Sequence, residues 1–239
     1  MLYIRVSTKE RRKLPPRGER CKTMRTIVVI PSYEPEERLI KLTAELVTKD
    51  LDVIIVDDGS GEKYLPIFDQ LTGARVLRHA ENQGKGAALK TAYQFIKENY
   101  PGQDLAVVTA DSDGQHSPED IMRIARRAAL DSDSLVLGVR NFDGQEVPLR
   151  SKVGNKITLK IFQLTSGSKL SDTQTGLRGF SGIHLDKMLE ISGSRFEYEM
   201  NVLMVWAKEK CPNCRSDNRC LRLVAPAGRN AGCLKSLFP

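Results

Sequence analysis

Two apolar patterns alternate regularly after Met24, and this alternation restricts the fold more than any other feature of the sequence. Short runs of consecutive apolar residues, as in 26–30 and 51–56, are typical of strands buried on both faces. Between these two runs, the apolar residues of 36–49 recur at helical spacing. Alternating strands and helices fold into a mostly parallel sheet flanked by helices. We therefore predict a single α/β domain over residues 24–210.

The same patterns predict the other elements of this domain. Ser117 is a predicted helix N-cap, because Pro118 and two acidic residues follow it. A loop over 172–181 is expected to lead into a short strand. Further strands are predicted at 74–77, 105–110 and 135–139, and further helices at 64–72, 86–100, 118–130, 154–165, 184–191 and 197–210.

Positive charge and cysteine are concentrated at the two ends of the chain. The 239 residues carry a net charge of +7, with +6 in residues 1–23, +4 in residues 211–239 and −3 in residues 24–210. Basic ends of this kind do not indicate a nucleic-acid-binding fold. All five cysteines also lie in the ends. The domain therefore needs no disulfide, and we predict a cytoplasmic protein.

Neither end of the chain resembles part of the domain. No apolar run reaches the roughly 20 residues of a membrane span, and residues 1–23 lack the apolar region of a secretion signal. We expect residues 1–23 to be a disordered basic leader or the product of a mis-assigned start. In 211–239 the apolar pattern stops, and we expect no structured segment between the cysteines. A frameshifted or truncated tail explains this most simply, and a zinc-binding module is the alternative.

Polar clusters follow the predicted strands, at the edge where α/β proteins bind their ligands. The segment Pro31-Ser32-Tyr33-Glu34 offers a ring that can stack on a base and a carboxylate that can bind a base or ribose. Residues 57–60 begin with two adjacent aspartates, whose mutual repulsion requires a compensating partner. Ordinary polar turns are the alternative for both clusters.

A third cluster, Asp111-Ser112-Asp113-Gly114-Gln115-His116, follows the strand predicted at 105–110. If strand geometry continues, both aspartates face one site, because residues two apart point the same way. Paired carboxylates suit a hard divalent cation that bridges phosphates. One aspartate could then face the ribose and the other could hold Mg²⁺ or Mn²⁺, with Gln115 as a further oxygen ligand. We expect His116 to be a surface residue, and the alternatives are a role in supporting the site's ligands or a place on the acceptor side.

Basic and polar groups complete the set of candidates. Residues 82–87 precede a helix and contain Lys85 and two glycines, so their backbone N–H groups could approach an anion. A plain glycine-rich loop is the alternative. Arg140, Arg150 and Lys152 follow the last parallel strand, where arginine pairs suit phosphate; a solvated basic loop is the alternative.

Two segments near the end of the predicted domain contain further charged residues. In 172–178, Asp172 could act as a base or contact a sugar, and Arg178 could be its charge partner. Residues 195–199 begin a helix with glutamates in its first turn, which capping explains without a ligand.

Together, these clusters resemble the family 2 glycosyltransferases, which have a Rossmann-like GT-A fold. Within this family, DSDGQH and NQGKG are most similar to the polyprenyl- and dolichyl-phosphate sugar synthases. The matching segments cover almost all of residues 24–210 and are, in order, IVVIPSYEP, VIIVDDGS, ENQGKGAALKTA, VVTADSDGQHSPED, LGVRN, DTQTGLRGF and FEYEMNVL.

The resemblance implies an inverting, metal-dependent transfer of a hexose from a UDP-glucose or GDP-mannose type donor to a polyprenyl or dolichyl phosphate at the membrane surface. It implies catalytic roles for Asp172, Arg140 and Arg150, with the arginines binding the acceptor phosphate. It also implies that Asp113 and Gln115 bind Mg²⁺ or Mn²⁺. The donor-binding residues that it implies are Pro31, Tyr33, Glu34, Asp58, Lys85, Asp111 and Gln174.

Two alternatives to this function remain, one with a different acceptor and one without turnover. A phosphate monoester is already ionised and needs cationic partners, whereas a hydroxyl needs a general base, so the two arginines favour the phosphate. The first alternative is a saccharide hydroxyl, as in cell-wall or polysaccharide synthesis. The second is a truncated nucleotide-sugar-binding remnant without turnover, because the chain changes character at Cys211.

Overall fold

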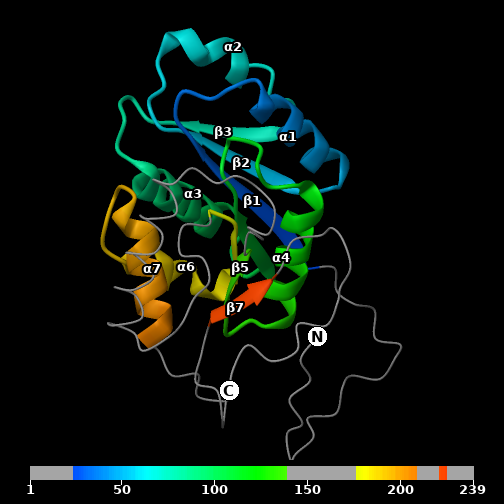
Figure 1. The fold of residues 1–239 in the computed structure, drawn as a ribbon, viewed down its shortest axis with the longest axis vertical. Coiled ribbons are helices and arrows are strands. Elements are labelled where there is room, and N and C mark those ends of the chain that lie inside the picture. Colours follow the sequence, from blue (N-terminus) through cyan, green and yellow to red (C-terminus); the bar gives the residue numbers. More distant parts are fainter. Residues whose placement is uncertain (1–23, 139–175, 209–220, 225–239) are drawn as a thin grey trace, which may run out of the picture. The chain divides into compact units, whose positions relative to one another are not determined.

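A computed structural model describes residues 24–138, 176–208 and 221–224 of the chain. Within these residues, seven strands form one sheet in the order β3-β2-β1-β4-β6-β5-β7. The strands run parallel, except that β6 is antiparallel to both β4 and β5. Helices flank this sheet (Figure 1). The predicted α/β class with a mostly parallel sheet is therefore confirmed.

The elements follow the predicted alternation along the chain. The strands are β1 (Arg25–Ser32), β2 (Asp52–Asp57), β3 (Ala74–Arg78), β4 (Leu105–Thr109), β5 (Leu135–Gly138), β6 (Arg178–Ser181) and β7 (Leu221–Val224). The helices are α1 (Arg38–Thr48), α2 (Leu65–Phe68), α3 (Lys85–Asn99), α4 (Pro118–Leu130), α6 (Leu185–Glu190) and α7 (Glu197–Lys208), with 3₁₀ turns at Glu62–Tyr64 and Gly182–His184. Among the helices described, none has the length and apolar character that crossing a membrane requires.

The sheet separates two apolar cores, because successive residues of a strand point to opposite faces. In β1, Ile27 and Val29 enter the core formed with α3, α6 and α7, whereas Val28 and Ile30 enter the core formed with α1, α2 and α4. Figure 1 shows the two groups of helices on opposite sides of the sheet. Burial on both faces explains why the central strands are continuous apolar runs in the sequence.

Local sequence signals place most element ends correctly. The hydroxyl of Ser117 accepts the N–H of Asp120 at 3.1 Å, so α4 begins as predicted. In contrast, β1 continues through Pro31 instead of stopping before it. The pairing of β4 with β1 ends at Val29, so Pro31 lies beyond that ladder, where a missing N–H is tolerated. The α2 helix is also shorter than predicted and ends at Phe68.

The strand β7 corrects the expectation that no structured segment lies between the tail cysteines. Leu221 pairs with Leu135 and Val224 with Gly138, so β7 extends the sheet in parallel beyond β5. Four residues are too few to show the alternation of apolar and polar side chains by which a strand is predicted from sequence. Pairing with the buried strand β5 identifies this segment as a strand. The leader 1–23, the helix predicted at 154–165 and all five cysteines lie outside the described residues.

Candidate functional site

Polar side chains meet at the carboxyl ends of β1, β2 and β4 and at the start of α3. The order β3-β2-β1-β4 changes direction between β1 and β4, and such a switch point is where open α/β sheets bind ligands. At its centre are Lys85 of α3, Asp111 after β4 and Glu199 of α7. Three elements that are distant in the sequence therefore contribute to one charged cluster.

Lys85 bridges the two carboxylates of this cluster. Its Nζ lies 2.7 Å from Oδ1 of Asp111 and 2.9 Å from Oε2 of Glu199. Burial opposes the ammonium charge, but the carboxylates of Glu199 and Asp111 outweigh it and raise the pKa of Lys85. Lys85 is therefore a fixed cation at the switch point, and its place near the donor stays a prediction.

Asp111 is held as a carboxylate. Burial disfavours its charge, but His116 and Lys85 outweigh this effect, so the pKa of Asp111 lies well below its usual range. A side chain on Gly176 would place its Cβ 2.2 Å from Oδ2 of Asp111, so only glycine fits against the carboxylate.

His116 is part of this site and not a surface residue. Its side chain is only 7% exposed, and its Nε2 lies 3.4 Å from Oδ2 of Asp111. Gly114, with φ of +71°, turns the chain before His116, and α4 begins two residues after it. The prediction of a surface histidine is therefore wrong, because it did not include this turn.

The two aspartates of the third cluster occupy different environments. β4 ends at Thr109, so strand alternation does not extend to Asp113. Asp113 instead lies in a turn, where its Oδ1 accepts the N–H of Gln115 at 3.0 Å, and both side chains are exposed. The expectation that strand geometry would orient both aspartates alike is therefore wrong.

The groups near Asp113 can hold a metal ion only if a bound substrate supplies further ligands to that ion. In the part of the chain that the structure covers, no three His, Cys, Asp or Glu side chains gather closely enough to hold an ion. Mg²⁺ is commonly held by one or two carboxylates together with substrate phosphates and water. The exposed carboxylate of Asp113 and the side-chain amide of Gln115 are oxygen donors of the type that such a shared site would use, and metal binding there stays a prediction.

The adjacent aspartates at the end of β2 have the compensating partners that their repulsion requires. Oδ1 of Asp57 accepts the N–H of Ser60 at 2.9 Å, and Arg78 lies 4.0 Å from its Oδ2. The buried carboxylate of Asp58 has a different partner, His79, whose Nδ1 lies 2.7 Å from Oδ1. This prediction is therefore confirmed for both residues.

The glycine-containing loop before α3 binds an anion that belongs to the protein itself. Oδ1 and Oδ2 of Asp58 accept the N–H groups of Gln83 at 3.0 Å and Gly84 at 2.8 Å. The N–H of Ala87 donates to the carbonyl of Ser194 at 2.8 Å. The N–H groups of Gln83, Gly84 and Ala87 therefore have protein acceptors, which a phosphate cradle formed by them would have to displace.

The tip of β1 presents the predicted aromatic residue. Pro31 is buried in the strand, whereas Tyr33 is 50% exposed and free to stack. Glu34 is exposed and has a φ of +50°, and its N–H donates to the hydroxyl of Ser60 at 2.9 Å. The bond to Ser60 holds this tip against the turn after β2.

Sequence reasoning missed Glu199. The nearby Glu197 accepts the N–H groups of Ser194 and Arg195 at 3.0 and 3.1 Å and so closes the turn that precedes α7. Glu199 instead points to Lys85, and Arg178 lies on its other side, with Nη2 of Arg178 3.6 Å from Oε1 of Glu199.

A sequence signal for Glu199 did exist. It lies three and seven residues before the buried Val202 and Trp206, so it shares their face of α7. A carboxylate on a buried helix face needs a cationic partner, and Lys85 and Arg178 provide it.

The remaining predicted residues are not placed. Arg140, Arg150, Asp172 and Gln174 lie outside the described residues, as does Lys152. The structure therefore brings Asp58, Lys85 and Asp111 to one edge of the sheet, with Tyr33 and Asp113 exposed, and leaves the acceptor side as a prediction.

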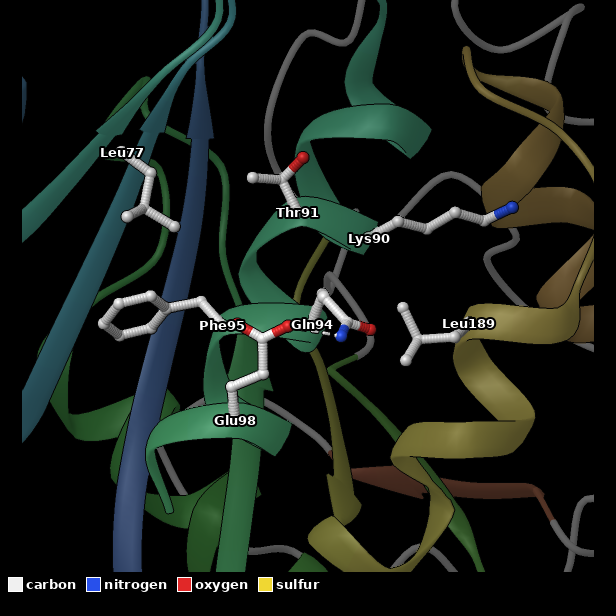
Figure 2. Close-up of a pocket in the computed structure, with 7 residues that line it drawn as sticks. All are labelled: Leu77, Lys90, Thr91, Gln94, Phe95, Glu98 and Leu189. Atoms are coloured by element: carbon white, nitrogen blue, oxygen red, sulfur yellow. Dashed lines mark hydrogen bonds between the residues drawn. The ribbon is translucent and has the colours of Figure 1, made fainter. Parts of the chain in front are cut away.

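A depression of about 490 Å³ lies elsewhere, between β3, the middle of α3 and α6 (Figure 2). It contains none of the predicted site residues. Its lining residues are Leu77, Lys90, Thr91, Gln94, Phe95, Glu98 and Leu189.

Comparison with known proteins identifies the family of this chain. The model of glycosyl transferase family 2 matches residues 27–188. The chain belongs to glycosyltransferase family 2. The UDP-N-acetylglucosamine–dolichyl-phosphate N-acetylglucosaminyltransferase of Methanococcus voltae is 32% identical in an alignment that covers 77% of this chain and 80% of that protein. The polyprenol monophosphomannose synthase of Mycolicibacterium smegmatis is 27% identical over 70% of this chain and 65% of its own length.

Solved structures confirm the fold of this glycosyltransferase. The glucosyl-3-phosphoglycerate synthase of Mycobacterium tuberculosis, solved with Mn²⁺, UDP and phosphoglyceric acid, superposes with a TM-score of 0.60. The likeness covers 85% of this chain and 69% of that one at 18% identity. The predicted GT-A fold is therefore confirmed.

Proposed function

We propose that this glycosyltransferase moves a hexose from a nucleoside-diphosphate sugar to a polyprenyl or dolichyl phosphate, with inversion at the anomeric carbon. The observation that carries the proposal is the Lys85 ammonium, held between Asp111 and Glu199 at the switch point of the sheet. An ammonium group fixed at this edge could donate a hydrogen bond to a diphosphate as it leaves the sugar. The relatives from Methanococcus voltae and Mycolicibacterium smegmatis, named for dolichyl phosphate and polyprenol, support the acceptor class.

The donor would lie across the ends of β1, β2 and β4. The exposed ring of Tyr33 can stack on the base, and the carboxylate of Asp111, which is 30% exposed, can accept a hydrogen bond from the nucleoside. The buried carboxylate of Asp58 would support the donor by holding the loop before α3. Asp113 and Gln115 would hold Mg²⁺ or Mn²⁺ on the diphosphate. Such an ion, when bound, offsets the negative charge that develops on the leaving group.

The acceptor would attack the face of the sugar opposite the diphosphate. A phosphate oxygen forms the new bond to the anomeric carbon as the bond to the diphosphate breaks, and no proton needs to be removed. This fits the described site, where Asp58 and Asp111 already bind internal N–H or cationic groups. By the family resemblance, Arg140 and Arg150 would bind the acceptor phosphate, and Asp172 and Gln174 would face the sugar.

A transfer assay tests the proposal. The purified chain is incubated with UDP-glucose, UDP-N-acetylglucosamine or GDP-mannose and dolichyl or undecaprenyl phosphate, with Mg²⁺, Mn²⁺ or EDTA. We expect one lipid-linked sugar, formed only with metal, with the opposite anomeric configuration to the donor by NMR. If the chain transfers the sugar to a saccharide added in place of the lipid phosphate, the proposed acceptor class is wrong. If transfer is undiminished in EDTA, the proposed metal dependence is wrong.

Asp113→Asn tests the metal ligand. This variant should lower kcat/KM at least about tenfold, because even second-shell partners of metal ligands cost this much. The matched control is Asp133→Asn, at an exposed aspartate in the turn before β5. Equal rates for both variants would remove Asp113 from the site.

A further inference from the structure

We propose that His79 is a positioning residue that fixes the start of α3 and thereby the place of Lys85. The effect of this positioning on catalysis rests on the proposed function. His79 directly follows β3, and its side chain is 7% exposed. Nδ1 lies 2.7 Å from Oδ1 of Asp58, and Nε2 lies 2.8 Å from the hydroxyl of Thr91. One imidazole ring therefore connects β3, the turn after β2 and α3.

The direction of the first bond follows from chemistry. A carboxylate can only accept a hydrogen bond, so Nδ1 of His79 carries the hydrogen and donates it to Asp58. The hydroxyl of Thr91 can donate to Nε2 and so hold the ring in this tautomer. His79 orients Asp58 in the same way that a ring N–H bound to a carboxylate orients other functional groups.

Asp58 transmits this position to the loop before α3. Its carboxylate accepts the N–H groups of Gln83 and Gly84, and Gly84 directly precedes Lys85. A Cβ on Gly59 would lie 2.3 Å from the carbonyl carbon of Glu81, so the turn after β2 and this loop are in direct contact. A shift of Asp58 therefore moves the backbone from which Lys85 extends.

Thr91 provides a second anchor on α3 itself. It lies six residues after Lys85, so the helix is held both just before its first turn and in its second. Figure 2 shows Thr91 projecting from α3 toward the side on which Leu77 lies, whereas Lys90 projects toward the opposite side. Because the ring contacts both Asp58 and Thr91, it restricts both the position of the helix start along the helix axis and its rotation about that axis. A single contact would leave one of these free.

The test uses two substitutions that separate the nitrogens of the ring. His79→Asn places an amide N–H near the position of Nδ1 and preserves the bond to Asp58. His79→Gln extends further, reaches toward Thr91 and leaves Asp58 without this donor. The matched control is His184→Gln, because His184 contacts the carbonyl of Ser132, away from the site.

Amide hydrogen exchange of the ligand-free protein and steady-state kinetics are then measured. In His79→Gln we expect exchange at Gly84 to be about tenfold faster and kcat/KM for the nucleotide sugar about tenfold lower, because a buried carboxylate loses a donor. In His79→Asn both values should stay within about threefold of the wild type. The His184 variant should leave both unchanged.

Two results would overturn the inference. One is exchange at Gly84 in His79→Gln that equals the wild-type rate. The other is a defect in His79→Asn as large as that in His79→Gln, which would show that the ring only fills space. If the wild-type protein makes no lipid-linked sugar, the proposed function fails, while the exchange comparison still decides the role of His79.

Discussion

Replacing Lys85 with methionine tests the charged cluster most directly. Methionine keeps most of the apolar stem of Lys85 and removes only the ammonium group, so packing is largely preserved. Asp111 and Glu199 then lose their shared cation, which lies within 3 Å of each. The two carboxylates are left partly buried and mutually repulsive.

The expected loss follows from these contacts. Each charge-assisted hydrogen bond contributes about 1.5–3 kcal/mol, and breaking a buried ion pair costs about 3–5 kcal/mol. The side chain of Lys85 is 18% exposed and that of Asp111 is 30% exposed, so water recovers part of this loss. We expect the free energy of unfolding to fall by about 3 kcal/mol, which lowers Tm by about 6–12 °C for a domain of this size.

Urea unfolding, followed by circular dichroism, measures the change. Lys41→Met, at an exposed position of α1, is the matched control and should change stability by no more than about 0.5 kcal/mol. Asp111→Asn in the Lys85→Met background removes the repulsion and leaves the pair of Arg178 with Glu199 in place, so it should restore stability by about 1 kcal/mol. A coupling energy between these two changes near zero would refute the reasoning.

Three further predictions concern the backbone and the titration of the site. Gly84→Ala should destabilise the protein by at least about 2 kcal/mol, because φ is +100° and the Cβ would lie 2.6 Å from the carbonyl oxygen of Ser194; an unchanged urea midpoint would contradict this. The pKa of Asp111 is lowered in the folded state, so its charge stabilises the fold above the unfolded pKa of about 4, and this contribution disappears as pH falls through the folded pKa. Unfolding free energies measured against pH should therefore show a gap between wild type and Asp111→Asn that is constant above about pH 5 and shrinks in acid; a gap that grows in acid would be inconsistent. Ser117→Ala should cost about 1 kcal/mol in thermal unfolding through loss of the bond to Asp120, and equal Tm values would mean that this cap contributes nothing.

Residue pairs that meet in space but lie far apart in the sequence show which parts of the site could be predicted from the sequence. The repulsion between Asp57 and Asp58 predicted that partners must exist, but not that His79 would be one of them. His79 lies 21 residues from Asp58, and its distance is set by the pairing of β2 with β3. Similarly, Asp111 was identified from its place after a strand, whereas its partner Glu199 comes from α7.

The sequence by itself determined the alternation of strands and helices, the edge of the sheet where polar residues gather and the family. These depend on local periodicity and on the carboxyl ends of parallel strands, which a single chain displays. Only the tertiary structure decided which charges pair. It placed Glu199 against Lys85, buried His116 beside Asp111, and gave the start of α3 the carboxylate of Asp58 as its anion. Pairing depends on the distance between elements far apart in the chain, and packing alone fixes that distance.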